Sequence, residues 1–536
     1  MQKSGRLELT WAGKYDKQKP LEPRILLERP ELSYGEQDNG NMLIHGDNLI
    51  ALRALEQDFA GKVKCIYIDP PYNTGSAFEH YEDGMEHSEW LCMMKPRLEL
   101  LRQLLSDDGF FCCHIDDSEG HYLKVILDEI YGRENYLTTL YVRVRYPDKT
   151  LKSDMDFHKE IEQIHVYQKG HNAKPNLNQE VIGYDKFCYS IETKVPYQEI
   201  KLGGKRVEIF EKGQYEIIQG EGTECGLKEI WASGTILDGN SSGRFFRDYL
   251  TGRYSIDGYS VLYKVYGIGD DRYDYRFFTG PQREGATKGK YYQGVPTSKL
   301  NTDEIVRKVP INGFYDLAGN FGNCRSEGGV DFRSGKKPEA LLEMILRFFS
   351  NPHDIVLDSF LGSGSTVATA HKMGRRWIGV ELGDHAYTHC KTRLDNVVDG
   401  EQSGISKTVG WQGGGGYRFY ELAPSLFEKH PLLPIYQINK EYTFEMLCEA
   451  ICKMEGFTYK PEGEMHGSSS ENSFIHIARE FVSGDYTTKL MKEIGDNQSV
   501  LIYAARLQSG LRLPDNVEVK KIPKDLIKKY KFESEV

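Results

Sequence analysis

Four consecutive residues, Asp69-Pro70-Pro71-Tyr72, directly follow the apolar run VKCIYI, which is typical of a buried strand. The carboxyl ends of parallel strands are where α/β enzymes place their sites. Two prolines fix this turn and remove two N–H donors, so its carbonyls can only accept hydrogen bonds. A carboxylate and a carbonyl that accept both hydrogens of an exocyclic amino group would direct its lone pair toward a methyl donor, and Tyr72 offers a ring on which an extruded base can stack. The alternative is a plain turn after a core strand.

A second candidate site is the glycine turn, residues 358–366 (DSFLGSGST), between a predicted strand and a predicted helix. Its spacing is GxGxT, not the GxGxxG that cradles phosphates in dinucleotide folds. An amino-acid-bearing nucleoside needs partners for an amine and a carboxylate. Asp358 is placed to hold the ammonium, and Ser365 and Thr366, at the start of the helix, are placed to hold the carboxylate. Taken alone, the pattern also fits a tight strand–helix turn.

Two further acids end predicted strands. Glu381 closes the strand RWIGVE and is placed to accept both hydroxyls of a ribose; the alternative is a surface acid. Asp47 closes the strand NMLIHGD. It can reach the amino group of a bound adenine nucleoside if its strand neighbours that of Glu381, and otherwise it caps the helix beginning at Asn48.

The pattern of elements around these residues predicts an α/β protein with an interruption. Strands and helices alternate up to Pro147, stop in a region rich in Gly, Tyr, Asp and Arg, and resume near residue 331. A glycine-rich stretch, WQGGGGY, is expected to be a hinge-like linker before the last α/β segment. The predicted divisions are an N-terminal arm (1–40), a first core half (41–147), a largely β insert (148–330), a second core half (331–410) and a C-terminal domain (411–536).

Composition excludes several classes of protein. Hydrophobic residues make up 39% and charged residues 27% of the 536, as in globular proteins. No apolar run approaches the roughly 20 residues of a membrane span, and no secretory h-region is present, so we expect a cytoplasmic protein. The ten cysteines form no CxxC pair, so no metal site is expected.

The net charge argues against nucleic-acid binding, whereas the middle of the chain favours it. The formal charge of −11 is unusual for a nucleic-acid-binding protein, although a local basic surface remains compatible with it. Residues 243–292 interleave arginines with many aromatic rings, a pattern that suits DNA; the alternative is an ordinary β surface. The candidate DNA contacts are Arg244, Arg247, Arg253, Arg272, Arg276 and Arg283.

Together these motifs resemble the amino-methylating DNA methyltransferases. The DPPY run precedes the glycine turn, which is the circularly permuted order of the β class. Within that class the chain resembles the Mod subunits of type III restriction-modification systems. The stretches that carry this resemblance are LIHGDNLIAL, IDPPYNTGS, KPEALLEMI, DSFLGSGSTVATA, IGVEL and WQGGGGYRFYEL.

The resemblance implies a circularly permuted Rossmann-like methyltransferase core with an inserted, largely β target-recognition domain and a C-terminal α/β domain. It implies S-adenosylmethionine as the cofactor. Double-stranded DNA, a second copy of the chain and a restriction (Res) subunit are the expected partners, and two copies sharing one duplex would better tolerate the acidic charge. The residues that match the family's catalytic loop are Asp69, Pro70 and Tyr72, and those that match its cofactor pocket are Asp358, Phe360, Gly362, Gly364 and Glu381, with Lys337 where the helix entering that pocket begins.

The expected reaction is in-line methyl transfer to N6 of adenine, catalysed by orientation and charge placement. Methylation of cytosine N4 uses the same chemistry and remains an alternative, although Asp at the head of the motif favours adenine because Ser is commoner in the cytosine enzymes resembled. A stand-alone adenine methyltransferase without a restriction partner is another alternative, and a non-catalytic DNA-recognition subunit is a third. A dehydrogenase is disfavoured by the glycine spacing.

Overall fold

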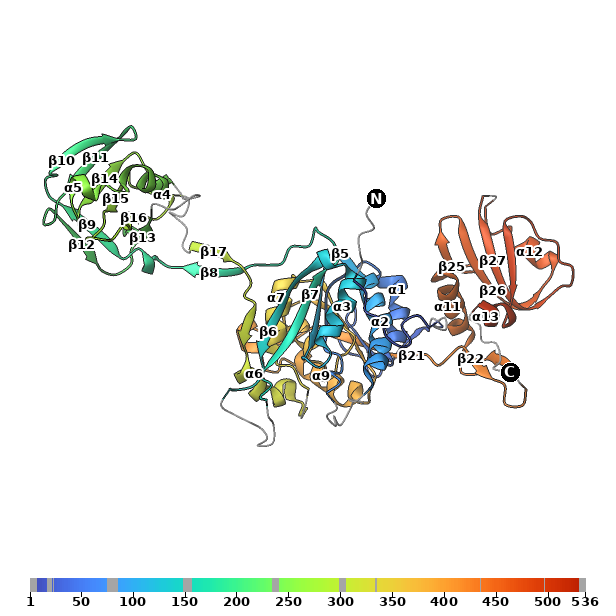
Figure 1. Ribbon diagram of the computed structural model, residues 1–536. Helices are drawn as coiled ribbons and strands as arrows, with labels where there is room; N and C mark the ends of the chain where they lie inside the picture. Colours follow the sequence, from blue (N-terminus) through green and yellow to red (C-terminus); the bar gives the residue numbers. More distant parts are fainter. Residues whose placement is uncertain are drawn as a thin grey trace. The chain divides into compact units, whose positions relative to one another are not determined.

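The chain folds into two compact units, which are described separately. Unit 1 comprises residues 1–176 and 312–536, and unit 2 comprises Leu177–Ile311 (Figure 1). The computed structural model describes residues 7–16, 22, 24–74, 85–147, 157–233, 241–297, 305–332, 335–433, 435–495 and 497–529.

The core of unit 1 is a mixed sheet with the strand order β1-β21-β3-β20-β19-β4-β5-β7-β6-β18. Its middle strands are parallel and strongly buried, as expected for a sheet with helices on both faces. These strands are β3 (Met42–His45), β20 (Arg376–Glu381), β19 (Ile355–Asp358), β4 (Val63–Ile68) and β5 (Leu105–Ile115).

The direction of the chain reverses between β4 and β19. From β4 the chain continues to its neighbour β5, whereas from β19 it continues to β20 on the other side. Such a switch point leaves a crevice at the carboxyl ends of the two strands, which is where α/β proteins bind ligands. The predicted Rossmann-like α/β core is therefore confirmed, with both candidate motifs at its switch point.

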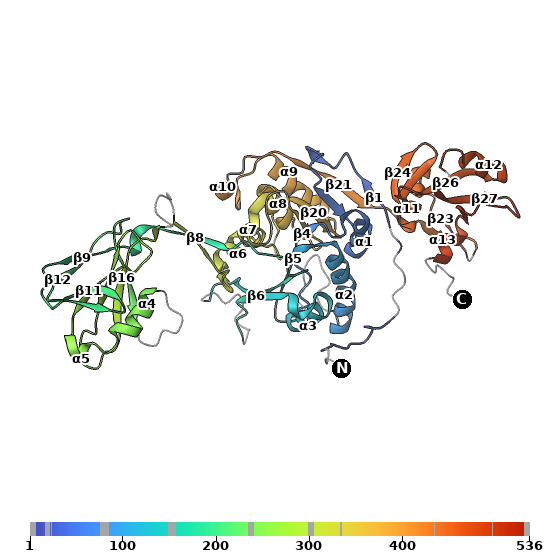
Figure 2. The same ribbon diagram turned by 90° about the horizontal axis from the view of Figure 1, so that it is seen from above.

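Helices cover both faces of this sheet (Figure 2). Several of them bury a mainly apolar side. On one face lie α1 (Asn48–Phe59), α2 (His87–Leu104) and α3 (Gly120–Tyr131). On the other lie α7 (Glu339–Phe349), α8 (Ser365–Lys372) and α9 (Thr392–Val398).

The core takes in residues that the sequence analysis assigned to the insert. Strand β7 (Ile161–Gln168) lies antiparallel between β5 and β6 (Tyr136–Arg143), and β18 (Phe314–Asp316) pairs with β6. Helix α6 (Ala318–Asn323) also belongs to unit 1. The predicted boundaries at 148 and 330 are thus too wide, because a strand that returns antiparallel without a crossover helix does not continue the βα alternation.

The glycine-rich stretch is docked on the core and is not a free hinge. Strand β21 (Gly416–Leu422) pairs in parallel with β3, and β1 (Leu26–Glu28) and β2 (Tyr34–Gly35) pair with β21. Gly414 N donates to Val398 O at 2.8 Å, and its carbonyl lies 2.9 Å from His371 Nε2. The core sheet therefore includes part of the predicted N-terminal arm and reaches Leu422 instead of ending at residue 410.

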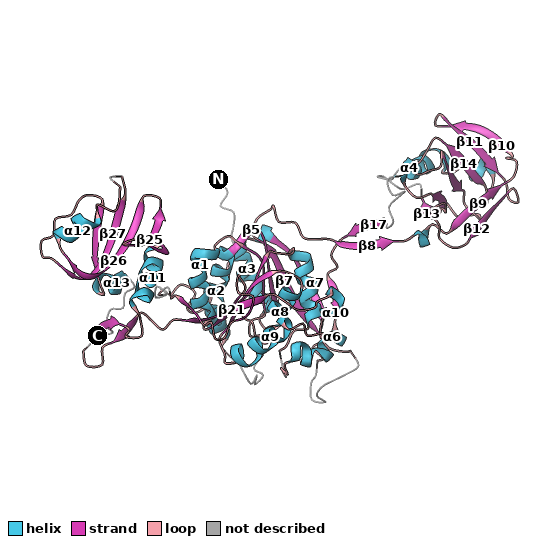
Figure 3. Ribbon diagram, turned by 180° about the vertical axis from the view of Figure 1, so that it is seen from behind, coloured by secondary structure: helices cyan, strands magenta, loops and turns pink. Residues whose placement is uncertain are grey.

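Unit 2 is built mainly of strands, as its composition suggested (Figure 3). Its six-stranded antiparallel sheet has the order β10-β11-β14-β15-β16-β13. One face packs on α4 and the π-helix that follows it, and the other packs on the β9–β12 pair. The bounds are β8 (Asn178–Ile182), β9 (Tyr189–Thr193), β10 (Gln198–Leu202), β11 (Lys205–Phe210), β12 (Tyr215–Gln219), β13 (Lys228–Ala232), α4 (Ser241–Phe245), the π-helix (Phe246–Leu250), α5 (Tyr254–Asp257), β14 (Leu262–Tyr266), β15 (Tyr275–Thr279), β16 (Gly289–Gln293) and β17 (Ile305–Val309).

The C-terminal part of unit 1 has its own five-stranded sheet, β24-β25-β26-β27-β28, with a separate apolar core. None of the helices in the described parts of the chain has the length and apolarity needed to cross a bilayer. The remaining bounds are α10 (Ser406–Val409), β22 (Phe427–Lys429), β23 (Tyr436–Ile438), α11 (Phe444–Glu455), β24 (Thr458–Glu462), β25 (Met465–Ser470), β26 (Ser473–Val482), α12 (Gly484–Leu490), β27 (Ser499–Leu507), β28 (Val517–Lys521) and α13 (Lys524–Lys529).

A buried asparagine ties three strands of the core together, which gives a test of this sheet order. Asn41 Oδ1 accepts from Trp377 N and its Nδ2 donates to Gly416 O, both at 3.0 Å. Asn41→Ala should lower the free energy of unfolding by about 1–3 kcal/mol, because Trp377 N is left buried without an acceptor. Urea unfolding measures this, with exposed Asn323→Ala as the control. Equal midpoints for the two variants would argue against the β20-β3-β21 arrangement.

Candidate active site

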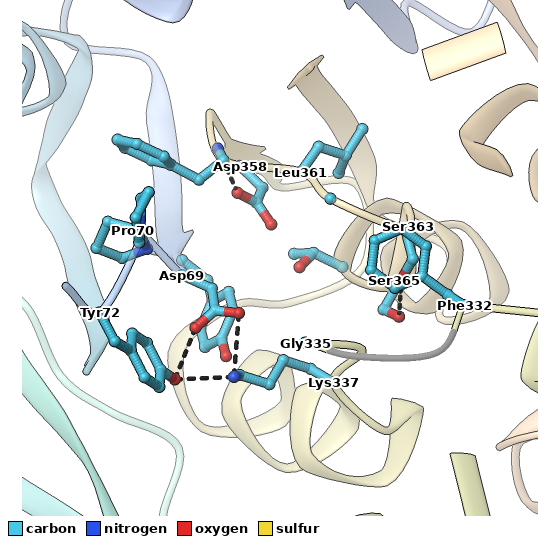
Figure 4. Close-up of a pocket in the computed structure, with 15 residues that line it drawn as sticks. Asp69, Pro70, Tyr72, Phe332, Gly335, Lys337, Asp358, Leu361, Ser363 and Ser365 are labelled. Carbon is cyan, nitrogen blue, oxygen red and sulfur yellow. Dashed lines mark hydrogen bonds and ion pairs between the residues drawn. The ribbon is translucent and has the colours of Figure 1, made fainter. Parts of the chain in front are cut away.

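A pocket opens at the carboxyl ends of β4 and β19 (Figure 4). It brings together the catalytic loop, residues 69–72, and the glycine turn, which are distant in sequence. Among the predicted catalytic and cofactor residues, all but Asp47, Gly364 and Glu381 line this pocket. Its lining is Tyr67, Asp69, Pro70, Pro71, Tyr72, Phe332, Gly335, Lys337, Asp358, Phe360, Leu361, Gly362, Ser363, Ser365 and Thr366.

The catalytic loop is held by contacts from both sides. Trp90 Nε1, from the buried face of α2, donates to Pro71 O at 2.8 Å. Tyr72 is turned back so that its hydroxyl donates to Asp69 Oδ1 at 2.8 Å. The loop is therefore a fixed turn, as its two prolines predict.

Lys337 was predicted to belong to the cofactor pocket, and in the structure it also contacts the catalytic loop. Its Nζ lies 3.1 Å from Asp69 Oδ2, donates to the Tyr72 hydroxyl oxygen at 2.8 Å, and sits 4.8 Å from the centre of the Tyr72 ring (Figure 4). Burial alone would lower the pKa of Lys337, but the carboxylates of Asp69 and Glu162 raise it above its usual value. The site thus contains a charged ammonium in direct contact with Asp69.

Two residues beside the catalytic loop, Glu162 and His114, were missed by the sequence analysis. Glu162, on β7, has its Oε2 3.0 Å from the Tyr72 hydroxyl oxygen and 3.5 Å from Lys337 Nζ. His114, at the end of β5, has Nε2 2.9 Å from Glu162 Oε2 and Nδ1 2.7 Å from Tyr67 OH. Burial would raise the pKa of Glu162, but Lys337 and His114 hold it well below its usual range. No motif marks Glu162, because only the antiparallel pairing of β7 with β5 carries it here.

Asp358 is buried at the opposite side of the pocket. One of its oxygens accepts from Phe360 N at 2.9 Å. Burial raises the pKa of Asp358 to about 7, although hydrogen bonds from Thr366 and Phe360 lower it in part. The negative charge of this buried carboxylate has little compensation from the chain, so the group is suited to bind a cationic group of a ligand.

The glycine turn owes its shape to two left-handed residues. Gly362 has φ +58° and Gly364, the residue before α8, has φ +78°. A Cβ at Gly364 would lie 3.3 Å from Cys390 Cα, so both conformation and space favour glycine there. The turn therefore brings backbone N–H groups and the start of α8 to the pocket.

Glu381 fastens the glycine turn to the end of β20. Its carboxylate accepts from Gly362 N at 2.6 Å and Gly383 N at 3.0 Å, and lies 2.8 Å from His385 Nε2. It is almost fully buried, which removes the alternative of a surface acid. Its role toward a ribose stays a prediction.

The start of α8 is tied to a buried cluster of charges. Ser365 Oγ accepts from Arg393 Nη1 at 2.6 Å, and Arg393 Nη2 in turn donates to Glu339 Oε1 at 2.8 Å. Lys372 donates to the same carboxylate. Ser365 is thus fixed by a fully buried guanidinium that no sequence motif indicated.

Asp47 has the geometry of a helix cap. Its Oδ1 accepts from Leu49 N and Ile50 N, and its Oδ2 lies 3.2 Å from Arg97. A ligand role for Asp47 required that its strand lie next to the strand of Glu381. This is the case, because β3 pairs with β20 and places His45 opposite Glu381. Capping is therefore established, and cofactor binding by Asp47 stays a prediction.

The comparison with known families decides what kind of protein carries this site. Residues 63–392 match the family model described as DNA methylase. This chain belongs to the DNA methylase family.

Several curated proteins are similar to this methylase. A probable type III restriction-modification enzyme HindVI Mod subunit from Haemophilus influenzae is 35% identical over 443 residues, covering 76% of this chain and 58% of the relative. The type III StyLTI Mod subunit from Salmonella typhimurium is 27% identical, with 67% and 55% covered. The type II methyltransferase M.EcaI from Enterobacter cloacae is 27% identical, with 64% and 66% covered. The chain thus spans little more than half the length of the two Mod subunits.

The arginines of unit 2 that were predicted to contact DNA differ in accessibility. Arg276 is 2% exposed and ion-paired with buried Asp271, so it is removed from the candidates. It lies on the face of β15 that carries Phe278 and packs on α4 and the π-helix, because alternate residues of a strand share a face. Arg244 and Arg283 are exposed. The others pair with neighbouring acids: Arg247 with Asp248, Arg253 with Asp257, and Arg272 with Glu224.

The raised pKa of Asp358 predicts a pH-dependent stability. A carboxyl group whose pKa is about 7 when folded and 3.8 in its reference state stabilises the fold below pH 4, and this contribution is lost as pH rises through 7. The amide of Asp358→Asn does not titrate. The free energy of unfolding of this variant, relative to that of wild type, should therefore rise between pH 5 and 8, by about 1.4 kcal/mol per pH unit at most. Urea unfolding of the protein without added ligand measures this. A difference that does not change with pH would contradict the assignment.

Proposed function

We propose that this methylase transfers a methyl group from S-adenosylmethionine to N6 of adenine in double-stranded DNA. The observation that carries the proposal is the meeting of the catalytic loop and the glycine turn in one pocket. The first holds acceptors for an amino group, and the second offers groups for a nucleoside that bears an amino acid. Neither motif alone distinguishes this function from a plain turn.

The pocket's own residues fit the cofactor. Asp358 is a buried carboxylate whose raised pKa would be relieved by an ammonium group. Ser365 and Thr366 at the start of α8 are placed for a carboxylate. Phe360, Gly362 and Gly364 shape the turn, while Glu381 and Asp47 are proposed to serve the ribose and the adenine. S-adenosylmethionine supplies an activated methyl group.

The chain's part in the reaction is to orient the target nitrogen. Asp69 and the Pro70 carbonyl accept the two amino hydrogens, which turns the nitrogen lone pair toward the methyl carbon. A nitrogen that accepts the methyl group must lose one proton, which Asp69 or water would take. Tyr72 provides an aromatic face for the extruded base. Catalysis therefore rests on positioning and charge placement.

Asp69→Ala tests the central claim. Methyl transfer should fall by roughly 100-fold or more, since one of the two acceptors is lost. Cofactor affinity should change by less than about threefold, because Asp69 faces the base and not the amino-acid part. Tritium transfer from labelled cofactor measures the first, calorimetry the second, and exposed Asp117→Asn is the control.

Base analysis of the tritiated DNA separates the two amino-methylation alternatives. Label in N6-methyladenine supports the proposal. Label in N4-methylcytosine would mean that the target base is cytosine and that the methyl-transfer chemistry is the same. If wild-type protein labels neither base, the remaining alternative is a DNA-recognition subunit that does not catalyse methyl transfer.

The partners are proposed on the strength of the relatives' names. Similarity to Mod subunits supports the modification subunit of a type III restriction-modification system. A Res subunit, a second copy of this chain and a cytoplasmic location belong to the same proposal. Similarity to a type II methyltransferase supports the alternative of a methyltransferase that acts without such a partner. The order of catalytic loop before glycine turn supports the permuted β class.

Unit 2 is proposed to select the DNA sequence. The pocket accounts for an adenine and a methyl donor only, so neighbouring bases must be read elsewhere, and unit 2 forms its own sheet, outside the switch-point pocket. Arg244 and Arg283 are its exposed candidates among the predicted arginines, and Arg247, Arg253 and Arg272 remain candidates that must exchange an acidic partner for DNA.

Exchange of unit 2 tests this assignment. Residues 177–311 are replaced by the corresponding unit of a related methylase with a known, different site, and methylated positions are mapped by sequencing. The chimera should methylate the donor's site, because the units are separately packed. Retention of the original site by an active chimera would place recognition in unit 1.

A further inference from the structure

The Tyr72 hydroxyl lies between two carboxylates. It is 2.8 Å from Asp69 Oδ1 and 3.0 Å from Glu162 Oε2. A phenol has one hydrogen to donate, so it can satisfy only one of these acceptors at a time. Lys337 Nζ donates to the same oxygen at 2.8 Å and so fixes the position of the hydroxyl. Its hydrogen can still point to either of the two carboxylates.

In this arrangement both oxygens of Asp69 are engaged. Oδ1 accepts from Tyr72, and Oδ2 lies 3.1 Å from the ammonium of Lys337. An amino group that is to donate to Asp69 must compete with these two donors. Lys337 is buried and Tyr72 is partly buried, so releasing them without another acceptor would leave polar groups poorly paired inside the pocket.

Glu162 has the position and the charge of that other acceptor. Its Oε2 is within reach of Tyr72 and lies 3.5 Å from Lys337 Nζ. His114 lies beside this carboxylate, with Nε2 2.9 Å from Oε2, and its Nδ1 is 2.7 Å from the Tyr67 hydroxyl. Glu162 is therefore placed to take both donors, with a second basic side chain next to it.

We propose that Glu162 is a positioning residue, an alternate acceptor that takes the Tyr72 hydrogen and draws the Lys337 ammonium when the target amino group enters, so that Asp69 becomes free to accept from that group. No covalent bond changes in this step, and the hydrogen stays on the Tyr72 oxygen. The inference rests on the proposed methyl transfer to DNA.

Glu162→Gln is the first test. The amide keeps the shape and one oxygen acceptor but loses the charge that strengthens such hydrogen bonds. The single-turnover rate of methyl transfer, at saturating DNA and S-adenosylmethionine, should fall by about tenfold, with cofactor affinity and melting temperature close to wild type. Glu455→Gln is the matched control, because Glu455 also accepts from a tyrosine, Tyr503, and pairs with lysines, but in the C-terminal sheet.

The second test is the same substitution in a Tyr72→Phe background. Phenylalanine keeps the ring and removes the hydroxyl that has to be redirected. The rate of Tyr72→Phe, whatever its level, is the reference, and adding Glu162→Gln should lower that rate by about threefold or less, since the two residues act through one hydrogen bond.

Two results would overturn the inference: a wild-type rate in Glu162→Gln, or an undiminished tenfold loss when Glu162→Gln is added to Tyr72→Phe. If Glu162→Gln melts early, the rates are compared at a temperature at which wild type, both single variants and the double variant all remain folded. Failure of the proposed function is distinct, since wild-type protein would then transfer no label to DNA.

Discussion

Parallel pairing of β4 with β19, at Cys65–Val356 and Ile66–Leu357, joins two parts of the chain that are far apart in sequence. Each strand ends in a turn that carries polar groups, and parallel strands end at the same edge of a sheet. The pairing therefore puts the catalytic loop opposite the glycine turn. What holds the strands is burial of apolar side chains on both faces of the sheet, since Ile66, Ile68, Val356 and Leu357 are fully enclosed.

The same burial makes the charges of the site interdependent. Lys337 lies between Asp69 and Glu162, and each ion offsets part of the desolvation of the others. Asp358 has hydrogen bonds but no such partner among the described contacts, and its pKa is raised accordingly. The pocket thus has one side whose charges are compensated by the chain itself and one side suited to a cationic group of a ligand.

Charge in unit 2 is organised in a different way. Most of the arginines considered for DNA contact are paired with acids a few residues away or on a nearby loop. Counting arginines in the sequence therefore overstates the free positive charge, which is consistent with a chain of net charge −11. Exposed pairs such as Arg247–Asp248 contribute little stability and can exchange partners, whereas the buried Arg276–Asp271 pair is part of the sheet's interior.

The sequence by itself determined the local features of this protein. The Pro70-Pro71 turn, the glycine turn and the apolar periodicity of strands and helices depend on neighbouring residues, so they and the α/β core were predictable. Only the tertiary structure decided which distant segments meet. It placed β7 in the core, and with it Glu162; it put Lys337 on Asp69, added β21 beside β3, and buried Arg276. The physical reason is that strand order and burial depend on the packing of the whole sheet, and an acid or an arginine carries no sequence mark of the partner it will meet.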